Sequence, residues 1–359
     1  MQKLTVIFKS TMLCISQFGA RPFRASRPGA RLFGAEIGGA GRASSIRFDS
    51  IAMPSLLRAL LPPVTTALAL QAAAGLPSIA AKSDRIYDLS GSLTFLAVGA
   101  LSLYMPRLVG PVIPSVISVL RGQGPTVLRH ADWRQLVLTG AVAIWATRLG
   151  SYLFARVLQN GHDSRFDEIK TSPPKFAGAF FGQALWVSLC LSPVILLNAV
   201  PPAVLSAAVP KLLLTDILGL TIWAGGFACE VIADRQKSAW VKEKKEKLHD
   251  EDFMTRGLFS KSQFPNYFGE ITLWTGIATV AAGILARQPV QLALGLSGSA
   301  GSILTTTALS YVSPAFAALL LTKVSGIPLS EEKYDKRYGH RKDYQEWKKN
   351  TPKLIPRFW

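Results

Sequence analysis

Apolar residues fall into long unbroken blocks along the chain, separated by shorter polar segments. Seven blocks reach about 20 residues or more, the length that an α-helix needs to cross a bilayer. They occupy residues 56–81, 87–105, 133–158, 176–200, 211–233, 267–286 and 303–329. Strands of a membrane barrel alternate apolar and polar positions, so continuous blocks favour helices. The pattern predicts an all-α, polytopic membrane bundle of about seven transmembrane helices, in a transmembrane domain at residues 53–329.

Composition agrees with this prediction. Only 17% of the residues are charged and 49% are hydrophobic, whereas soluble domains carry about 25% charged residues. One apolar run, residues 111–120, is too short to cross a bilayer and is expected to be re-entrant or interfacial. The first predicted span is weakened by Pro62, Pro63 and Pro77.

The net charge of +18 indicates a membrane surface rather than nucleic acid. Lysines and arginines gather in the loop at residues 234–261 and in the segment after residue 329. Two predicted spans separate these segments, so both lie on one side, which the positive-inside rule makes the cytosol. There they can meet anionic headgroups. We therefore expect the lipid bilayer as a partner, no nucleic acid, and a basic cytosolic tail at residues 330–359.

The first 52 residues are basic, and their only acids are Glu36 and Asp49. Helix parity places the start of the first span on the non-cytosolic side, which conflicts with so basic a stretch. Two explanations fit: an organelle transit peptide, or translation that begins at Met53. A transit peptide would indicate a mitochondrial membrane; otherwise the endoplasmic reticulum is expected. In both cases residues 1–52 form a basic, disordered leader outside the fold.

The sequence offers no metal or disulfide chemistry. Cys14, Cys190 and Cys229 cannot build a disulfide framework, and two of them lie inside apolar spans, as small buried hydrophobes do. The four histidines show no paired spacing, and neither a zinc motif nor a phosphate-binding glycine loop occurs. We expect no protein-built metal site.

Two arginines are candidates for ligand binding. Arg148 lies well inside the third predicted span, where a charge costs at least about 2.5 kcal/mol on insertion scales. It is expected to face the bundle interior and to meet a carboxylate or an anionic ligand; a structural ion pair is the alternative. Arg165 lies in the next loop, beside Asp163. Its planar guanidinium suits that carboxylate or a phosphate.

Glu230 and Asp234 lie four residues apart and therefore share one face of the fifth predicted span. Like charges repel there, and Glu230 lies within the apolar run. The arrangement makes sense if this face meets Arg148, a ribose or a substrate. A ligand-binding wall and a buried ion pair are the two interpretations.

The polar loop at residues 257–270 enters the sixth predicted span. At the end of that membrane helix it places Lys261, Asn266, Tyr267 and Glu270. Pro265 disfavours helix at the residue before it, so we expect the helix to begin near Asn266, which can cap it. Free N–H groups at a helix start, with a lysine nearby, favour an anion. The loop predicts binding of a phosphate-bearing cofactor.

With these residues assembled, the chain resembles the steroid 5-alpha-reductase C-terminal-domain family, in its uncharacterised, fungal-type branch. The similarity extends over residues 84–359. Its strongest blocks are residues 227–237, 257–270 followed by Trp274, 325–329 with Glu331 and Glu332, 344–347 and 351–356. Weaker agreement surrounds residues 145–149 and 163–166. The order and spacing of these blocks are specific for the family and much less so for the substrate.

The resemblance implies a seven-helix membrane oxidoreductase whose C-terminal helices and loops hold NADPH from the cytosolic side. The basic tail at residues 330–359 is expected to close the cofactor site. By position, Asp234 matches the family's acidic cofactor-helix residue, and Asn266 and Glu270 match its Asn-aromatic-x-Gly-Glu motif. The other residues that we expect at the cofactor are Arg148, Arg165, Glu230, Lys261 and Tyr267. The implied reaction delivers a hydride to the beta carbon of an enone and a proton to the alpha carbon. The implied substrate is a hydrophobic small molecule of lipid metabolism, a lipid-like enone or a steroid-like double bond.

The chain departs from the family at two points. Many relatives read Ser-Arg-His-Pro-Asn-Tyr where this chain has Gln263 and Phe264 before its proline. This change weakens phosphate binding through the loop or shifts it to Lys261. Relatives also polarise their substrate with a Glu and a Tyr from the N-terminal helices. Here the candidates for that catalytic role, by residue type alone, are Tyr87, Asp88 and Tyr104.

Two other functions stay open. Related membrane methyltransferases of the isoprenylcysteine and phospholipid type use an Arg-His-Pro-x-Tyr loop and bind S-adenosylmethionine, a pattern from which Gln263 and Phe264 depart. A non-enzymatic membrane protein, such as a transporter, would use Arg148 and Glu230 to line a pathway. Against a transporter, the sequence shows no internal repeat of the kind found in many transporters.

Overall fold

The computed structural model of the chain describes residues 55–108, 131–160, 163 and 165–357. Contacts divide the chain into two units, residues 1–51 and residues 52–359. The predicted leader and the predicted interfacial run at residues 111–120 lie outside the described residues. All described helices belong to the second unit.

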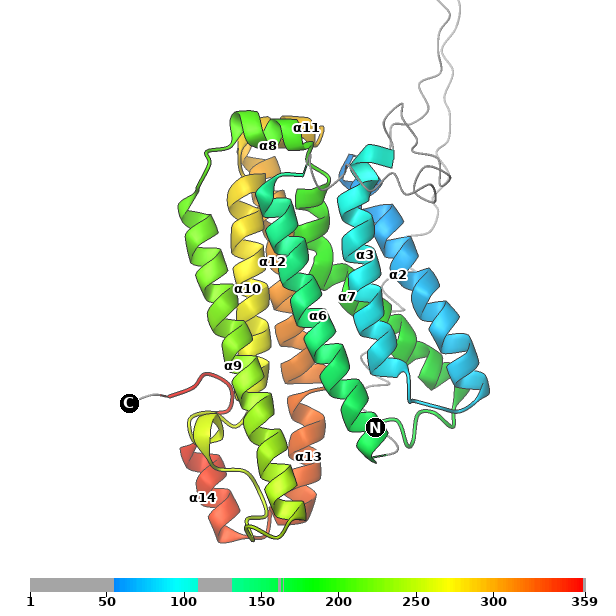
Figure 1. Ribbon diagram of the computed structural model, residues 1–359, viewed down its shortest axis with the longest axis vertical. Coiled ribbons are helices and arrows are strands. Elements are labelled where there is room, and N and C mark those ends of the chain that lie inside the picture. Colours follow the sequence, from blue (N-terminus) through cyan, green and yellow to red (C-terminus); the bar gives the residue numbers. More distant parts are fainter. Residues whose placement is uncertain (1–54, 109–130, 161–162, 164, 358–359) are drawn as a thin grey trace, which may run out of the picture. The chain divides into compact units, whose positions relative to one another are not determined.

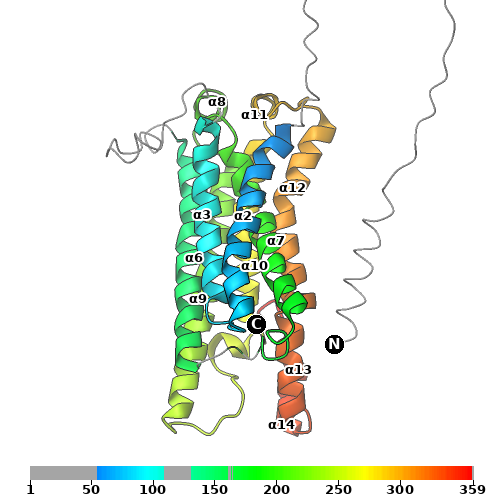
Figure 2. The same ribbon diagram turned by 90° about the vertical axis from the view of Figure 1, so that its right-hand side faces the viewer.

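Seven of the described helices have 20 residues or more. They are α2 (Ser55–Ala80), α3 (Tyr87–Leu108), α6 (Trp133–Asn160), α7 (Pro173–Asn198), α9 (Leu214–Lys245), α10 (Pro265–Leu285) and α12 (Ala300–Leu319). These helices run side by side (Figures 1 and 2). The described part of the chain contains no strand. The predicted all-α membrane bundle is confirmed.

Six stretches of the described residues are long and apolar enough to cross a membrane. They contain α2, α6, α7, α9, α10 and α12. The predicted span at residues 87–105 forms α3 and packs against α6, α7 and α2, but it is not among these six. The last predicted span forms α12 and the π-helical turn Leu320–Val324; after a bend at residues 325–326, a further helix continues to Tyr338.

Short helices lie at both ends of the long ones (Figure 1). One end carries α8 (Pro202–Ala208) and α11 (Gln288–Ala293). The other end, called the basic end below, carries the turn η1 (Gly257–Ser260), α13 (Ile327–Tyr338) and α14 (Lys342–Asn350). Helix α9 has 32 residues and is therefore about 48 Å long. Because a hydrocarbon core is about 30 Å thick, the last turns of α9 extend past it into the basic end.

Helices α9 and α10 pack more extensively than any other pair in the described residues, and glycines line their contact. Gly219 and Gly226 on α9 face Gly269 and Gly276 on α10, with a spacing of seven residues on each helix. A Cβ atom at Gly226 would lie 2.5 Å from the backbone nitrogen of Leu273. The two backbones therefore touch, as in the small-residue contacts of membrane helices.

A buried ion pair fastens α6 to α9 at the end opposite the basic end. The guanidinium of Arg134 donates to both carboxylate oxygens of Asp216, the closest at 2.7 Å, and the two side chains are 1% and 0% exposed. Arg134 also donates to the carbonyl of Pro210, and Asp216 accepts from the backbone of Leu213. Both charges therefore have a charged partner and a backbone hydrogen bond, as stable buried charges need. This pair is a structural fastening.

The glycine contact predicts opposite effects at two adjacent positions. Gly226→Ala should lower the free energy of unfolding by about 1–3 kcal/mol, because the new methyl group meets the backbone of α10. Gly225→Ala is the matched control, since a Cβ atom there has nothing within 4 Å. The control should be neutral or slightly stabilising. Thermal unfolding of both variants in detergent measures the difference, and equal losses of stability would contradict the contact.

Candidate functional site

Three long helices bring four polar side chains together toward the basic end. Arg148 on α6 donates to Glu230 on α9 at 2.6 Å and also to Asp234, one turn further along the same helix. The two carboxylates are nearly buried, with side-chain exposures of 3% and 6%. Asn266 on α10 donates to the other oxygen of Asp234 at 3.3 Å. The predicted meeting of Arg148 with the acidic face of α9 is confirmed.

Aromatic side chains of α6 orient this cluster. The indole N–H of Trp145 donates to Glu230 at 3.1 Å, and the ring of Tyr152 lies 5.5 Å from the guanidinium carbon of Arg148. Trp145, Arg148 and Tyr152 lie at spacings of three and four residues, so they share one helix face. The carboxylate of Glu230 is therefore held by two donors from α6, which fixes its position.

Two further polar groups of α10 lie beside the cluster without a hydrogen-bond partner. Glu270 is only 9% exposed, and no described residue donates to its carboxylate; it is close enough to Arg148, Glu230 and Asp234 to interact with their charges. Trp274, one turn further along, is fully buried, and its indole N–H has no acceptor. Buried polar groups are usually paired. This unmet donor and acceptor therefore suit a bound polar ligand.

Trp274 belongs to a group of packed rings on the membrane side of the cluster. Its neighbours are Phe95 on α3 and Trp145 on α6, with ring centroids 5.8 and 5.0 Å from that of Trp274. Trp186 on α7 contacts both of these neighbours. The rings shield Glu230 and its partners from the rest of the bundle, and in that low-polarity environment their electrostatic interactions are strong.

The cluster continues into a small pocket at the basic end. Lys237 lines the pocket together with Asn266, Tyr267 and a set of aromatic residues that includes Phe264 and Trp347. Lys237 follows Asp234 by three residues, so its ammonium group extends the acidic face of α9 toward the pocket. It forms no ion pair with any described carboxylate. A half-buried, unpaired cation in a pocket favours an anionic ligand group.

The loop before α10 is held by α9. The Oε1 atom of Gln236 accepts the backbone N–H of Leu258 at 2.9 Å. Gly257 has φ +59°, a conformation that favours glycine, and a Cβ atom there would overlap the side chain of Gln236. Gln236 and Gly257 thus fix the turn η1, and η1 sets the course of the residues that lead to Asn266.

The expected cap at Asn266 is wrong. Helix α10 begins one residue earlier, at Pro265, with Phe264 as its N-cap residue. Proline suits a first helical turn because its missing N–H is not needed there. Asn266 therefore lies inside the first turn, and its side-chain amide contacts Asp234 instead of capping the helix.

Gln263 and Phe264, which depart from the family pattern, contact other parts of the protein. The side-chain amide of Gln263 donates to the carbonyls of Lys348 and Thr351, at the end of α14. The ring of Phe264 is parallel to that of Tyr267, with centroids 5.6 Å apart. The two positions therefore build a hydrogen bond to the C-terminal segment and an aromatic pocket wall.

Arg165 belongs to a separate ion-pair group between α3 and α6. It donates to Asp163 at 2.7 Å and to Asp88 at 2.8 Å, and Arg156 adds weaker contacts to both carboxylates. Lys170 and Asp84 extend the group toward α2. Arg165 therefore already has two carboxylate partners. Of the two partners expected from the sequence, a carboxylate or a phosphate, the structure contains the carboxylate.

The catalytic candidates Tyr87 and Tyr104 lie apart from each other, and the hydroxyl of Tyr87 bonds to a group outside the Arg148 cluster. They are separated by 17 positions in α3, which corresponds to about 25 Å along the helix. The hydroxyl of Tyr87 donates to the carbonyl of Ala179, and its ring packs against Phe166 and Phe180. Tyr87 has a structural contact, and Tyr104 lies toward the end opposite the basic end.

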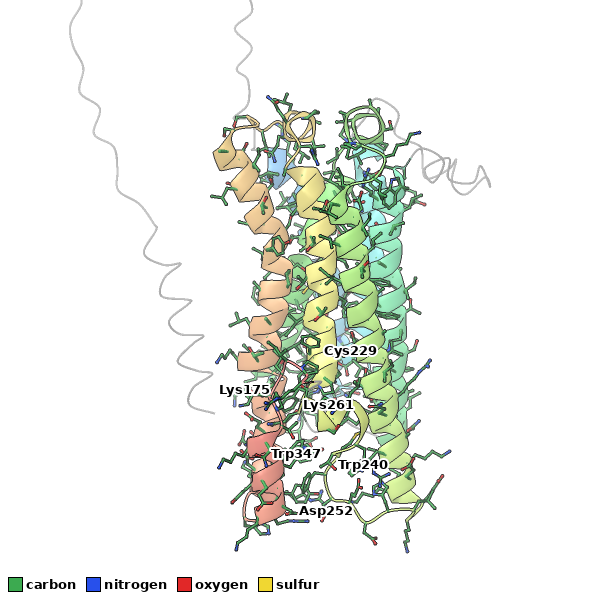
Figure 3. All side chains as sticks on the ribbon, turned by 90° about the vertical axis from the view of Figure 1, so that its left-hand side faces the viewer. Lys175, Cys229, Trp240, Asp252, Lys261 and Trp347 are labelled. Carbon is green, nitrogen blue, oxygen red and sulfur yellow. The ribbon has the colours of Figure 1, made fainter. Side chains whose placement is uncertain are left out.

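Lys261 also lies outside the pocket. Its side chain is exposed at the junction between the long helices and the basic end (Figure 3), and its carbonyl accepts the backbone N–H of Arg357. The lysine in the pocket is Lys237, which sequence reasoning missed. Its spacing from Glu230 and Asp234, on one helix face, was the available signal. Trp145 was missed as well, although it lies three residues before Arg148.

The sequence of this helical bundle matches a known family model. A family model described as "Protein of unknown function (DUF1295)" matches residues 107–351, which contain every member of the Arg148 cluster. The chain belongs to the DUF1295 family. This family is related to steroid 5-alpha-reductase-like membrane proteins. No curated protein and no solved structure matches the chain.

In this DUF1295 protein, Arg148 is predicted to be essential for stability. Arg148→Met leaves Glu230 and Asp234 without their shared cation and should lower the free energy of unfolding by about 3–5 kcal/mol. Adding Glu230→Gln to that variant should restore part of the loss. Arg156→Met, on the same helix but 41% exposed, is the control and should cost about 1 kcal/mol or less. Thermal unfolding in detergent tests the comparison, and equal losses would contradict a shared role for Arg148.

A pH dependence follows from the Asp163 group. Burial would raise the pKa of Asp163, but its hydrogen bonds to Arg165 and the charges of Arg165 and Arg156 outweigh burial and hold the pKa below its ordinary value. A lowered pKa in the folded state means stability that is complete above about pH 4, the ordinary pKa of aspartate, and is lost as the pH falls through the folded-state pKa. The unfolding temperatures of wild type and Asp163→Asn should therefore differ most near neutral pH and converge in acid. A constant difference across that range would contradict the assignment.

Proposed function

We propose that this DUF1295 protein is an integral-membrane, NADPH-dependent reductase of a hydrophobic enone. The observation that carries the proposal is the pairing of two features. One is the set of unmet buried groups on α10, the carboxylate of Glu270 and the N–H of Trp274. The other is the unpaired Lys237 in the adjoining pocket. One site thus offers polar contacts inside the membrane region and a cation at the basic end.

The residues present fit the chemical groups of a nicotinamide dinucleotide. A carboxamide needs one acceptor and one donor, which Glu270 and Trp274 supply. The carboxylate of Asp234 can accept a hydrogen bond from a ribose hydroxyl. Arg148 and Asn266 fix the position of this carboxylate. A phosphate suits Lys237, which is the unpaired cation of the pocket. When bound, the nicotinamide would supply a hydride for reduction of a carbon–carbon double bond.

The chain's own residues would position the cofactor and exclude water from it. The donors from α6 hold Glu230, so Arg148 and Trp145 keep the cluster fixed while a ligand binds. The packed rings around Trp274 separate this polar region from the rest of the bundle. A hydrophobic substrate would reach the site from the bilayer. A lipid-like or steroid-like enone fits this route, with the endoplasmic reticulum as the proposed membrane and the basic end in the cytosol.

Cofactor binding is predicted to depend on Lys237 and Asn266. Lys237→Met and Asn266→Ala should each weaken NADPH binding to the purified protein in detergent, Lys237→Met by about tenfold or more, because it removes a charged partner of a phosphate. The matched control is Lys245→Met on the exposed end of α9, which should bind as wild type does. Fluorescence titration with NADPH measures the dissociation constants.

Parallel titrations with S-adenosylmethionine test the competing methyltransferase function. Binding of S-adenosylmethionine without binding of NADPH would refute the reductase proposal. Equal NADPH affinity in Lys237→Met and wild type would refute the assignment of the phosphate to Lys237.

A further inference from the structure

The pocket lies between two parts of the basic end. One part is the body, formed by α9, η1 and the start of α10. The other, called the cap below, consists of α13, α14 and residues 351–357. Tyr334 and Trp347 of the cap face Lys237 and Asn266 of the body across the pocket. The space left is about 50 Å³, whereas pockets that hold cofactors and drug-sized ligands enclose about 300–1,000 Å³. The described pocket is therefore too small for such a ligand as it stands.

A change of helix type separates the cap from α12. Helix α12 ends in a π-helical turn, Leu320–Val324, in which the N–H of Ser325 donates to the carbonyl of Leu320 at 2.9 Å. Ser325 and Gly326 then interrupt the helix, and Pro328 helps to start α13. Kinks and hinges concentrate at π-turns and at Gly/Ser pairs. A Cβ atom at Gly326 would lie 2.6 Å from the carbonyl oxygen of Leu321, so glycine permits the bend.

The far end of the cap is fastened to the loop before α10. Backbone N–H groups of Gln263 and Phe264 donate to the carbonyls of Pro352 and Lys353, at 2.9 and 3.2 Å. The N–H of Arg357 donates back to Lys261 at 2.9 Å. The side-chain amide of Gln263, only 7% exposed, adds bonds of 2.9 and 2.7 Å to two carbonyls of the cap. Gln263 thus makes three of these contacts.

A second attachment joins the cap to the loop after α9. The ring of Phe253 packs among Tyr338, Tyr344 and Trp347, and Arg341 pairs with Asp252 in an ion pair that is about one-third exposed on each side. Figure 3 shows Asp252 at the far end of this region, beyond Trp240 and Trp347. Exposed ion pairs contribute little stability. The hydroxyl of the buried Ser262 adds a bond of 2.8 Å to the carbonyl of Leu354. The cap is therefore held mainly by one small aromatic cluster and by the hydrogen bonds of residues 262–264, of which Gln263 makes the most.

We infer that the cap is a hinged lid, bending at the π-turn and Ser325–Gly326, and that Gln263 is the latch residue that holds it closed. A ligand of cofactor size can enter or leave this pocket only when the lid opens. Regions with few buried apolar contacts open locally at a lower free energy than the global unfolding of the protein. The inference does not depend on which cofactor binds; only the choice of NADPH as a probe rests on the proposed function.

Hydrogen exchange of the ligand-free, full-length protein in lipid nanodiscs tests the lid. Peptides covering residues 261–264 and 351–357 should exchange together and faster than peptides from the middle of α10. In Gln263→Glu, an isosteric change, the new carboxylate faces two carbonyl oxygens and loses both donated bonds. Exchange in both segments should then rise by about tenfold or more, while the middle of α10 stays unchanged.

The matched control is Gln345→Glu on α14. Gln345 is exposed and donates one bond, at 2.7 Å, to the carbonyl of Gly339 within the cap itself. This variant should exchange as wild type does at both latch segments. Equal acceleration by the two variants would overturn the role of Gln263 as a latch. Exchange of the latch segments in step with the middle of α10 in wild type would overturn the lid, and this comparison needs no variant that might misfold.

Added NADPH separates this inference from the proposed function. If both hold, NADPH slows exchange of the two latch segments in wild type. If the latch segments open as expected but NADPH has no effect, the lid is supported and the cofactor assignment is contradicted.

Discussion

Direct contact between the backbones of α9 and α10 is the constraint on which the site depends. Side chains larger than hydrogen at Gly226 or Gly269 would push the helices apart. Gly269 lies against the backbone of Glu230, and its neighbour in sequence is Glu270. Without this contact, the amide of Asn266 would not reach Asp234, and Glu270 would not lie near the other carboxylates. The glycines therefore position the polar groups without contacting any ligand themselves.

The two buried ion-pair systems of the long helices differ in how fully they are satisfied. Arg134 and Asp216 use their charges on each other and on neighbouring backbone groups. The Arg148 system instead has one arginine for the carboxylates of Glu230, Asp234 and Glu270, and it adjoins an indole N–H without a partner. A fastening needs complete pairing, because unpaired buried charge is costly. Incomplete pairing in the second system is what distinguishes a candidate site from a fastening.

Long apolar blocks and charges inside them made two features predictable from the sequence. The long helices follow from their continuous apolar blocks, and the meeting of Arg148 with Glu230 follows from the cost of burying either charge alone. Closure of the site by the C-terminal segment was expected, but the bend before the cap and the placement of Gln263 were not, because they depend on contacts between segments far apart in the chain. Asn266 shows the same limit. A local rule predicted that it caps the helix, but its side-chain amide donates to Asp234, which is distant in the sequence. Lys237 was missed although its spacing from Asp234 on α9 was visible in the sequence.

The 32-residue length of α9 carries a consequence for how this protein can vary. One uninterrupted helix bears Gly219 and Gly226, then Glu230 and Asp234, then Lys237 and the anchor Gln236. Deleting a single residue between Gly226 and Glu230 would turn everything beyond it by about 100°. The side chains of Glu230, Asp234, Gln236 and Lys237 would then all face away from α6 and α10. Substitutions on the outer face of α9 are tolerable, but insertions and deletions within it are not.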